Sequence, residues 1–211
     1  MFYLKTSPEN SLDQILNKGG FVWLIGLVLI LFSCSEKKEI SKPYYPVDSL
    51  ITAQVTYLKD SKGALTKVAS LGEHHDSTTY IPADSIAWAN ELEVFALLKA
   101  INKPVYHGQY TVEDGLPDAN SNLKILSFKS AKQLPISSLK IFYQDSHENV
   151  RKIEAVYSEM NPLYKSSRTL QLELQDIGHQ AVVTSYAVVG GQKMILKDSV
   201  RFSLKGTIKI P

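Results

Sequence analysis

One dense cluster of side chains able to ligate a metal or transfer protons occurs at Glu73-His74-His75-Asp76. Carboxylates and imidazoles bind divalent metals and act as general acids and bases. Adjacent histidines, however, point in different directions in most backbones, so a single metal ion rarely binds both. The sequence also contains no His-Glu-x-x-His motif and no cysteine-based zinc spacing. We therefore expect a solvated loop at this cluster and no bound metal.

Arg168 is a second candidate because its neighbours are apolar at alternate positions. If residues 164–175 form a strand, Arg168 shares a face with Tyr164, Leu170 and Leu172. A charge on an apolar face needs a partner, since an unpaired buried charge is costly. Two interpretations remain open at this point: a structural ion pair with an acid from a helix, such as Glu91, or a groove that binds an anionic group.

Four tyrosines fall on inward positions of successive expected strands: Tyr143, Tyr157, Tyr164 and Tyr186. A row of tyrosines can line a ligand groove, because each ring is apolar and carries a polar hydroxyl. The same row is also typical of a half-buried sheet face whose hydroxyls reach water. Together with Arg168, these four residues define a possible ligand groove.

No pattern in the sequence indicates catalysis. The chain has no Gly-x-Ser-x-Gly nucleophile elbow, no phosphate loop and no dinucleotide fingerprint. Glu91 and Glu93 are two residues apart on an expected helix, so their carboxylates diverge. The lysines lack the interleaved aromatic residues of a single-strand nucleic-acid binder. We expect no catalytic residues, no cofactor and no nucleic-acid partner.

The only cysteine, Cys34, follows an uninterrupted apolar run from Phe21 to Phe32. This run is too short to cross about 30 Å of hydrocarbon, which takes roughly 20 residues. Its length suits the hydrophobic region of a signal peptide, and Lys18 supplies the positive flank. The segment resembles a bacterial lipoprotein signal peptide, with a lipobox at Leu31-Phe32-Ser33-Cys34.

That resemblance implies a signal peptide over residues 1–33, lipid attachment at Cys34 and a polar tether over residues 34–45. The protein would then be held in the bacterial cell envelope, at the outer membrane, by acyl chains. A lipid-modified Cys34 leaves no thiol for a disulfide. Two alternatives remain open: an uncleaved signal anchor, or a buried helix with Cys34 as a core residue.

Charge is unevenly distributed along the remaining chain. Residues 34–121 carry eight Lys and twelve acidic residues, whereas residues 122–211 carry thirteen basic and seven acidic residues. The basic half favours either attraction to the acidic half within the fold or contact with phosphate-bearing lipid or saccharide. Lysines scattered over a solvated sheet face would give the same excess of basic residues in the second half.

Helical period appears in two segments. Apolar residues spaced three and four apart predict a helix over Pro46–Lys59. A second helix is expected to start at Asp84, a capping residue, and to end near Asn102, because Pro104 disfavours helix at Lys103. Between them, residues 60–80 lack helical period and are interpreted as a loop, with a short hairpin around Ala64–Leu71 as an option.

From Val105 onward the period changes to two. The clearest alternation places Leu170, Leu172 and Leu174 on one face and polar residues on the other. Turn residues separate the later strands at short intervals, which favours antiparallel pairing. The sequence thus predicts a single α+β domain over residues 46–211, with two N-terminal helices packed on one antiparallel meander sheet of six to eight strands.

The body of the chain resembles uncharacterised cell-envelope lipoproteins of Bacteroidota-type bacteria. The resemblance rests on three strings: Ile153–Tyr157, Leu163–Arg168 and Gly190–Ser199. It implies an envelope lipoprotein without an assigned activity. We therefore expect a non-catalytic binding or assembly module, with envelope proteins or a lipid as partners. The alternative is a carrier or receptor for a lipid or other hydrophobic ligand in a half-open sheet groove.

Overall fold

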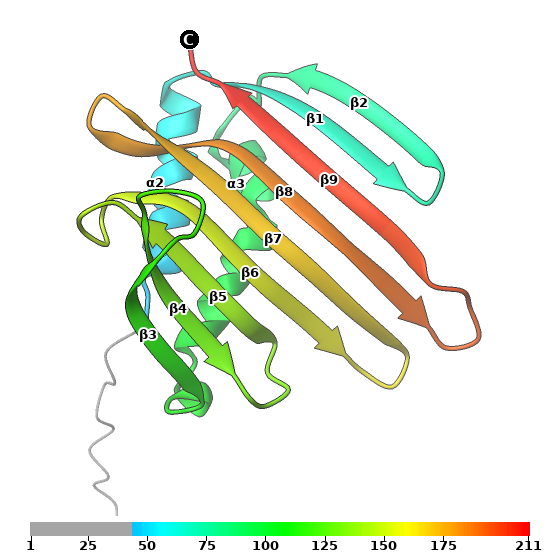
Figure 1. Cartoon of the computed structure of the whole chain (residues 1–211). Helices are drawn as coiled ribbons and strands as arrows, with labels where there is room; N and C mark the ends of the chain where they lie inside the picture. The colour runs from blue at the N-terminus through cyan, green and yellow to red at the C-terminus, as the bar shows by residue number, and fades with distance from the viewer. Residues whose placement is uncertain (1–43) are drawn as a thin grey trace, which may run out of the picture. The chain divides into compact units, whose positions relative to one another are not determined.

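The computed structural model describes residues 44–211, which belong to one compact unit of the chain. The predicted signal peptide, Cys34 and the greater part of the tether lie outside the described residues. The folded part consists of one antiparallel sheet with helices on one of its faces (Figure 1). We call this face the helix-side face and the opposite one the outer face.

Both predicted helices form where their apolar period places them, and the second begins after its predicted capping residue. Helix α2 spans Val47–Asp60, and α3 spans Ser85–Ala96 with a 3₁₀ continuation, η1, over Leu97–Asn102. The carboxylate of Asp84 accepts a hydrogen bond of 2.8 Å from the Ala87 amide, as expected of an N-cap. A second 3₁₀ turn, η2, begins at Pro104 and ends at Tyr106.

Nine strands of the described residues form the sheet, in the order β2-β1-β9-β8-β7-β6-β5-β4-β3. Every neighbouring pair is antiparallel, so β3 to β9 form a meander and the N-terminal hairpin joins the C-terminal strand. Their bounds are β1 Ala64–Leu71, β2 His74–Tyr80, β3 Tyr110–Pro117, β4 Lys124–Ser130, β5 Ile136–Tyr143, β6 Val150–Met160, β7 Tyr164–Ile177, β8 Gln180–Met194 and β9 Val200–Lys209.

The α+β class and the antiparallel sheet agree with the sequence, but two details were wrong. The sheet has nine strands rather than six to eight, and the helices do not both precede it, because the β1–β2 hairpin lies between them. Residues 60–80, predicted to be a loop with a short hairpin as an option, form β1 and β2, and β2 is exposed along its whole length. A strand that buries neither face has no apolar alternation to detect.

The core lies between the helix-side face and the two helices. Trp88, Leu92 and Phe95 of α3 are buried against residues that alternate along the central strands. Leu170, Leu172 and Leu174 all face inward, which confirms the predicted alternation of β7. At roughly 1.5–3 kcal/mol for each large apolar side chain, this burial supplies most of the gain that opposes chain entropy.

Two glycines of β8 and β9 make room for aromatic rings on the neighbouring strand. Gly206 pairs with Tyr186, and Gly190 pairs with Phe202. A Cβ atom on Gly206 would overlap the Tyr186 ring, and one on Gly190 would lie 2.8 Å from the Phe202 ring. Each ring therefore lies flat across its glycine neighbour, which compensates for the side chain that the glycine lacks.

A bulge in β8 is held by a side chain from α2. The register against β7 shifts so that Glu173 pairs with Ser185 but Leu174 pairs with Val183. The part of β8 before Ser185, residues 180–184, does not pair with β9. The buried amide of Gln54 takes the place of the missing strand, because it donates to the Ala181 carbonyl and accepts from the Val183 amide, each at 2.8 Å.

Burial decreases along the strands toward one end of the helix-side face. In β8, Tyr186 is buried whereas Met194 is 43% exposed, and in β9, Ile208 is buried whereas Val200 is 45% exposed. Figure 1 shows the reason, since the lower ends of β7, β8 and β9 extend past both helices. The helices thus leave one end of the apolar face uncovered.

We predict that Gln54→Leu lowers the free energy of unfolding by about 2–4 kcal/mol, because it leaves a buried carbonyl and a buried amide without partners. Thr52→Ala, on an exposed position of the same helix, should change it by less than about 0.5 kcal/mol. Urea unfolding measures both. Equal effects of the two substitutions would contradict the role assigned to Gln54.

Candidate ligand groove at the uncovered end of the sheet

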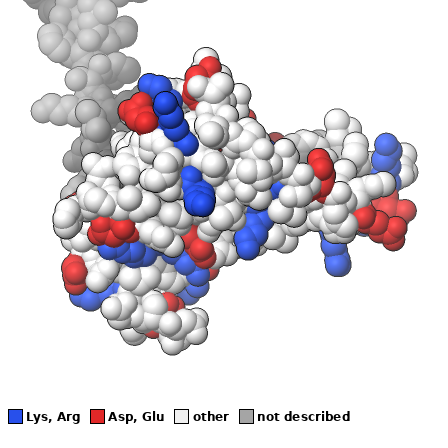
Figure 2. Space-filling model, turned by 90° about the horizontal axis from the view of Figure 1, so that it is seen from above, with Lys and Arg blue, Asp and Glu red and all other residues white. Residues whose placement is uncertain are grey.

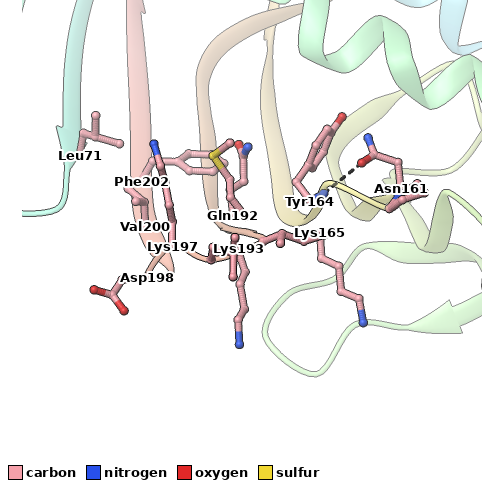
Figure 3. Close-up of a pocket in the computed structure, with 14 residues that line it drawn as sticks. Leu71, Asn161, Tyr164, Lys165, Gln192, Lys193, Lys197, Asp198, Val200 and Phe202 are labelled. Atoms are coloured by element: carbon pink, nitrogen blue, oxygen red, sulfur yellow. Dashed lines mark hydrogen bonds between the residues drawn. The ribbon is translucent and has the colours of Figure 1, made fainter.

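The uncovered end of the helix-side face forms an open groove of about 1100 Å³. Its floor comes from the ends of β7, β8 and β9, and its rim from the turns that connect strands at this end (Figure 3). The lining residues are Leu71, Asn161, Pro162, Tyr164, Lys165, Gln192, Lys193, Met194, Ile195, Leu196, Lys197, Asp198, Val200 and Phe202.

Strand alternation separates the apolar floor from the charged side chains. Figure 3 shows the Phe202 and Tyr164 rings on one side of the sheet, whereas Lys193 and Lys165 extend from the other side. This is the alternation expected of neighbouring positions in a strand. The groove is therefore apolar and aromatic at its base, with ammonium groups close to its rim.

Hydrogen bonds from backbone amides tie the rim together. The Asn161 side chain accepts from the amides of Leu163 and Tyr164, at 2.8 and 3.0 Å, which fixes the turn between β6 and β7. The Ile195 amide then donates to the Leu163 carbonyl at 3.0 Å and joins this turn to the one between β8 and β9. These hydrogen bonds fix the shape of the groove's rim.

Arg168 lies on the helix-side face, where alternation placed it, but it does not pair with Glu91. No ion pair within residues 44–211 includes Arg168, and its Nε atom is buried without a hydrogen-bond partner. The first interpretation from the sequence, a pair with Glu91, is therefore not formed. The second, a contact with an anionic group, remains a prediction.

The structure brings together only part of the tyrosine row. Tyr157 pairs with Arg168 across β6 and β7, and Tyr164 lies four residues before Arg168 on the same face. A hydrogen bond with Glu159 raises the pKa of Tyr164. Tyr186 instead lies buried under α3, 5.9 Å from the ring of Phe95 between centroids. Tyr143 is the last residue of β5 and therefore lies at the end of the sheet away from Arg168.

Tyr143 belongs to a small polar cluster that the sequence did not indicate. Its hydroxyl donates to the Asp114 carboxylate at 2.8 Å, and His147 lies 3.1 Å from the same carboxylate. Burial raises the pKa of Asp114, but hydrogen bonds from Tyr143, His147 and the Gly115 amide lower it more, so it lies below its ordinary value. The side chains of Asp114 and His147 are both about half exposed. We interpret the cluster as a surface clamp between β3 and β5.

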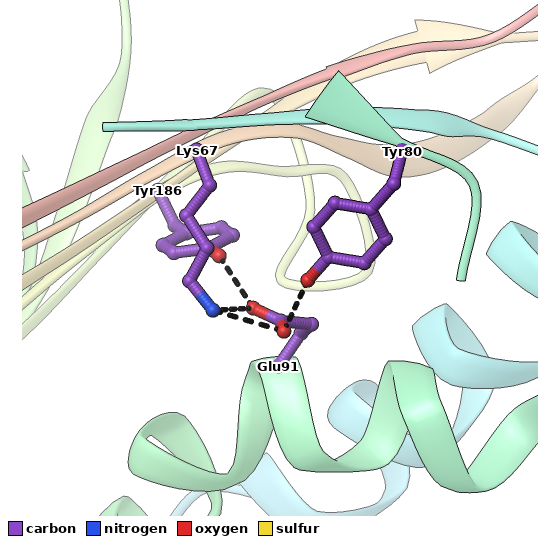
Figure 4. A network of polar contacts seen from close by, with 4 residues as sticks. All are labelled: Lys67, Tyr80, Glu91 and Tyr186. Carbon is purple, nitrogen blue, oxygen red and sulfur yellow. Dashed lines mark hydrogen bonds and ion pairs between the residues drawn. The ribbon is translucent and has the colours of Figure 1, made fainter. Parts of the chain in front are cut away.

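A second polar network joins α3 to the edge of the sheet. Both oxygens of the Glu91 carboxylate accept from the Lys67 ammonium, at 2.9 and 2.7 Å, and two hydroxyls donate to it, Tyr80 at 2.6 Å and Tyr186 at 3.0 Å (Figure 4). These residues come from α3, β1, β2 and β8. The network therefore fastens the exposed β1–β2 hairpin to the helix and to the centre of the sheet.

The pKa values in this network show how tightly the charge is held. Burial raises the pKa of Glu91, but Lys67 and the two tyrosines lower it more, so it lies below its ordinary value of 4.5. Burial and the hydrogen bond to Glu91 raise the pKa of Tyr80 to about 12. The same causes raise the pKa of Tyr186. Glu91 is a carboxylate at neutral pH, and both tyrosines are protonated donors.

The cluster at Glu73–Asp76 lies at the turn and the start of β2 rather than in a loop. His74 and His75 occupy adjacent strand positions, so their rings point to opposite faces. Within residues 44–211, no group of three or more His, Cys, Asp and Glu side chains is placed to hold a metal ion. On the face seen from above, acidic and basic side chains are interspersed (Figure 2).

Comparison with known proteins gives no relative from which to transfer a function. No family model, no curated protein and no solved structure matches this chain. Among the described residues, neither helix is both long and apolar enough to span a bilayer.

We predict that Glu91→Gln lowers the free energy of unfolding by about 2–3 kcal/mol, since it leaves the partly buried Lys67 without its counter-charge. Glu93→Gln removes one charge from an exposed position of the same helix and should have an effect below about 0.5 kcal/mol. Thermal or urea unfolding measures both. If the two variants unfold alike, the network does not carry this part of the stability.

The difference between wild type and Glu91→Gln should also depend on pH. The folded-state pKa of Glu91 lies below the value of 4.5 in the unfolded chain, so its contribution is complete above about pH 4.5. It is lost as the pH falls through the folded-state pKa. Stability measured from pH 7 down to pH 3 should therefore show the two proteins converging. A constant difference over this range would contradict the assignment.

Proposed function

We propose that the protein is a lipid-anchored, non-catalytic binding module of the bacterial cell envelope, in the outer membrane, whose binding site is the groove at the uncovered end of the sheet. The observation that carries the proposal is the apolar floor, which the helices leave open although they cover the rest of the same face. An exposed apolar surface with a defined rim is typical of a contact site for a partner or ligand. The anchor is inferred from Cys34 and the apolar run before it.

Non-catalytic action is supported by what the groove offers chemically. Its lining supplies aliphatic and aromatic carbon, amide groups, ammonium groups, the Tyr164 hydroxyl and a single carboxylate, Asp198, and these groups can bind and orient a molecule. The most tightly hydrogen-bonded carboxylate of the described residues, Glu91, is committed to the fold by four contacts. Binding therefore accounts for the arrangement without a reaction.

A second candidate function is a carrier or receptor for a lipid or another hydrophobic ligand. It is favoured by the size of the groove, which is comparable with pockets for small hydrophobic molecules. It is also favoured by Arg168, whose buried and unpartnered Nε lies near Tyr164. Arg168 itself is not among the residues that line the groove, so an anionic head would approach it from beside Tyr164 while the chain of the amphiphile lies over Phe202.

The anchor is tested by metabolic labelling with a palmitate analogue. We expect the full chain to be labelled and Cys34→Ala to be unlabelled, because the thiol is the attachment point. Ser35→Ala serves as the matched control and should be labelled like wild type. A labelled Cys34→Ala protein, or a native N-terminus at Met1, would show that the anchor is not formed as proposed.

Native mass spectrometry of protein purified from its own host distinguishes the two functions. A carrier should retain a bound lipid that Met194→Glu, in the groove, releases. Val189→Glu, at a comparably exposed position of the outer face, should keep it. Arg168→Met should also release an anionic lipid while unfolding at the same temperature as wild type, because no ion pair is broken. A co-purified protein without lipid favours the binding module.

A further inference from the structure

Aliphatic side chains project into solvent from three turns at the groove end. We call this group the apolar tip; it comprises Leu71, Met160, Leu163, Ile195 and Leu196. All five are more than half exposed, and Leu196 is 99% exposed. Hydrogen bonds from Ile195 to Leu163 and from Gly72 to Arg201 hold the turns next to one another. Exposed aliphatic carbon gathered in this way indicates a contact with an apolar environment.

Leu196 is the clearest sign that the tip is not explained by folding. Its φ angle of 62° lies in the left-handed region, where glycine or asparagine is the usual choice. The side chain packs against nothing that would offset this strain, since it is almost completely exposed. A leucine at this position costs stability and gains none from the core, so a contact outside the chain accounts for it better.

Basic side chains surround the tip. Lys165, Lys193, Lys197 and Arg201 are all exposed and none forms an ion pair with a described residue. Lys132 also lines the outer-face cavity of about 920 Å³ at this end of the sheet. Acidic groups near the tip are fewer: Glu73, Glu159 and Asp198. Aliphatic residues ringed by cations are typical of proteins that contact anionic lipid.

The start of the described chain lies at the same end of the sheet. Tyr44 packs on Tyr110 and Phe128, with ring centroids 5.8 and 5.7 Å away, where β3 begins and β4 ends. Because the strands alternate in direction, β6, β8 and β1 also end there. The ten residues from Cys34 to Tyr44 reach at most roughly 35 Å when fully extended. A lipid at Cys34 would keep the tip within reach of the membrane.

We propose that the apolar tip docks on the anionic lipid surface of the membrane in which the protein is anchored. The aliphatic residues enter the interface, and the surrounding lysines and Arg201 contact lipid phosphates. This inference rests on the proposed lipid anchor. It predicts that the domain has a fixed orientation on the membrane, with the groove opening toward the lipid.

The test uses the full lipidated chain reconstituted into vesicles, with an environment-sensitive dye on a single introduced cysteine. Cys34 is the only natural cysteine and is blocked by lipid, so a maleimide dye reacts only with Leu196→Cys. Asn120→Cys, in an exposed turn at the opposite end of the sheet, is the matched control. Vesicles consist of phosphatidylcholine alone or of phosphatidylcholine with phosphatidylglycerol, and aqueous iodide quenches accessible dye.

We expect quenching at position 196 to be several-fold weaker in vesicles containing phosphatidylglycerol than in phosphatidylcholine vesicles. Quenching at position 120 should be the same in both. Adding Lys193→Glu and Lys197→Glu to the Leu196→Cys protein should restore quenching, because it reverses the charge next to the tip. These substitutions lie on exposed positions and spare the core.

Three results would overturn the proposal: a dye at position 196 that is equally accessible in both lipids, one that is equally shielded in both, or one that is shielded only when envelope proteins are added. The last result would assign the tip to a protein partner. Failure of the anchor itself is recognised separately. In that case wild-type Cys34 reacts with the dye, whatever the accessibility of position 196.

Discussion

Coverage of one sheet face by two short helices is the constraint on which the rest of this structure depends. Burial under α2 and α3 stabilises Leu65, Leu170 and Tyr186, and it ends where the helices end. The strands β7, β8 and β9 continue past that point, where their inward positions carry apolar and aromatic residues together with Ser166, Arg168 and Gln192. One geometric mismatch between helix coverage and strand length therefore produces both the core and the open groove.

Polar contacts compensate where this burial is weakest. The hairpin of β1 and β2 has little core of its own, since β2 is exposed throughout. Glu91 links it to α3 and β8 through one ion pair and two tyrosine hydroxyls. Gln54 does the same for the bulged part of β8, where β9 no longer pairs. In both places a helix side chain forms hydrogen bonds with polar groups of the sheet that the neighbouring strands leave without partners.

The groove and the apolar tip share residues, so the two proposals bear on one another. Ile195 and Leu196 form the rim of the groove and also part of the tip. Docking of the tip on lipid would place the mouth of the groove at the membrane surface. A hydrophobic ligand could then pass between bilayer and groove without crossing water, whose contact with apolar carbon is unfavourable. A partner protein on the same membrane would then meet this domain in a fixed orientation.

Local sequence pattern was enough to predict the elements whose residues alternate or repeat because one side is buried. The stripe of α3, the cap at Asp84 and the inward leucines of β7 were all predictable from local pattern. The same reasoning placed Arg168 on the apolar face, but it suggested a pair with Glu91 that the structure does not form. It could not place residues whose partners are far along the chain: Glu91 lies 24 residues from Lys67 and 95 from Tyr186. Nor could it detect β2, which buries nothing, or the bulge that Gln54 holds from 129 residues away. Periodicity reports only whether a face is buried. The identity of the group that contacts it, and the point where coverage stops, are decided by how the elements pack.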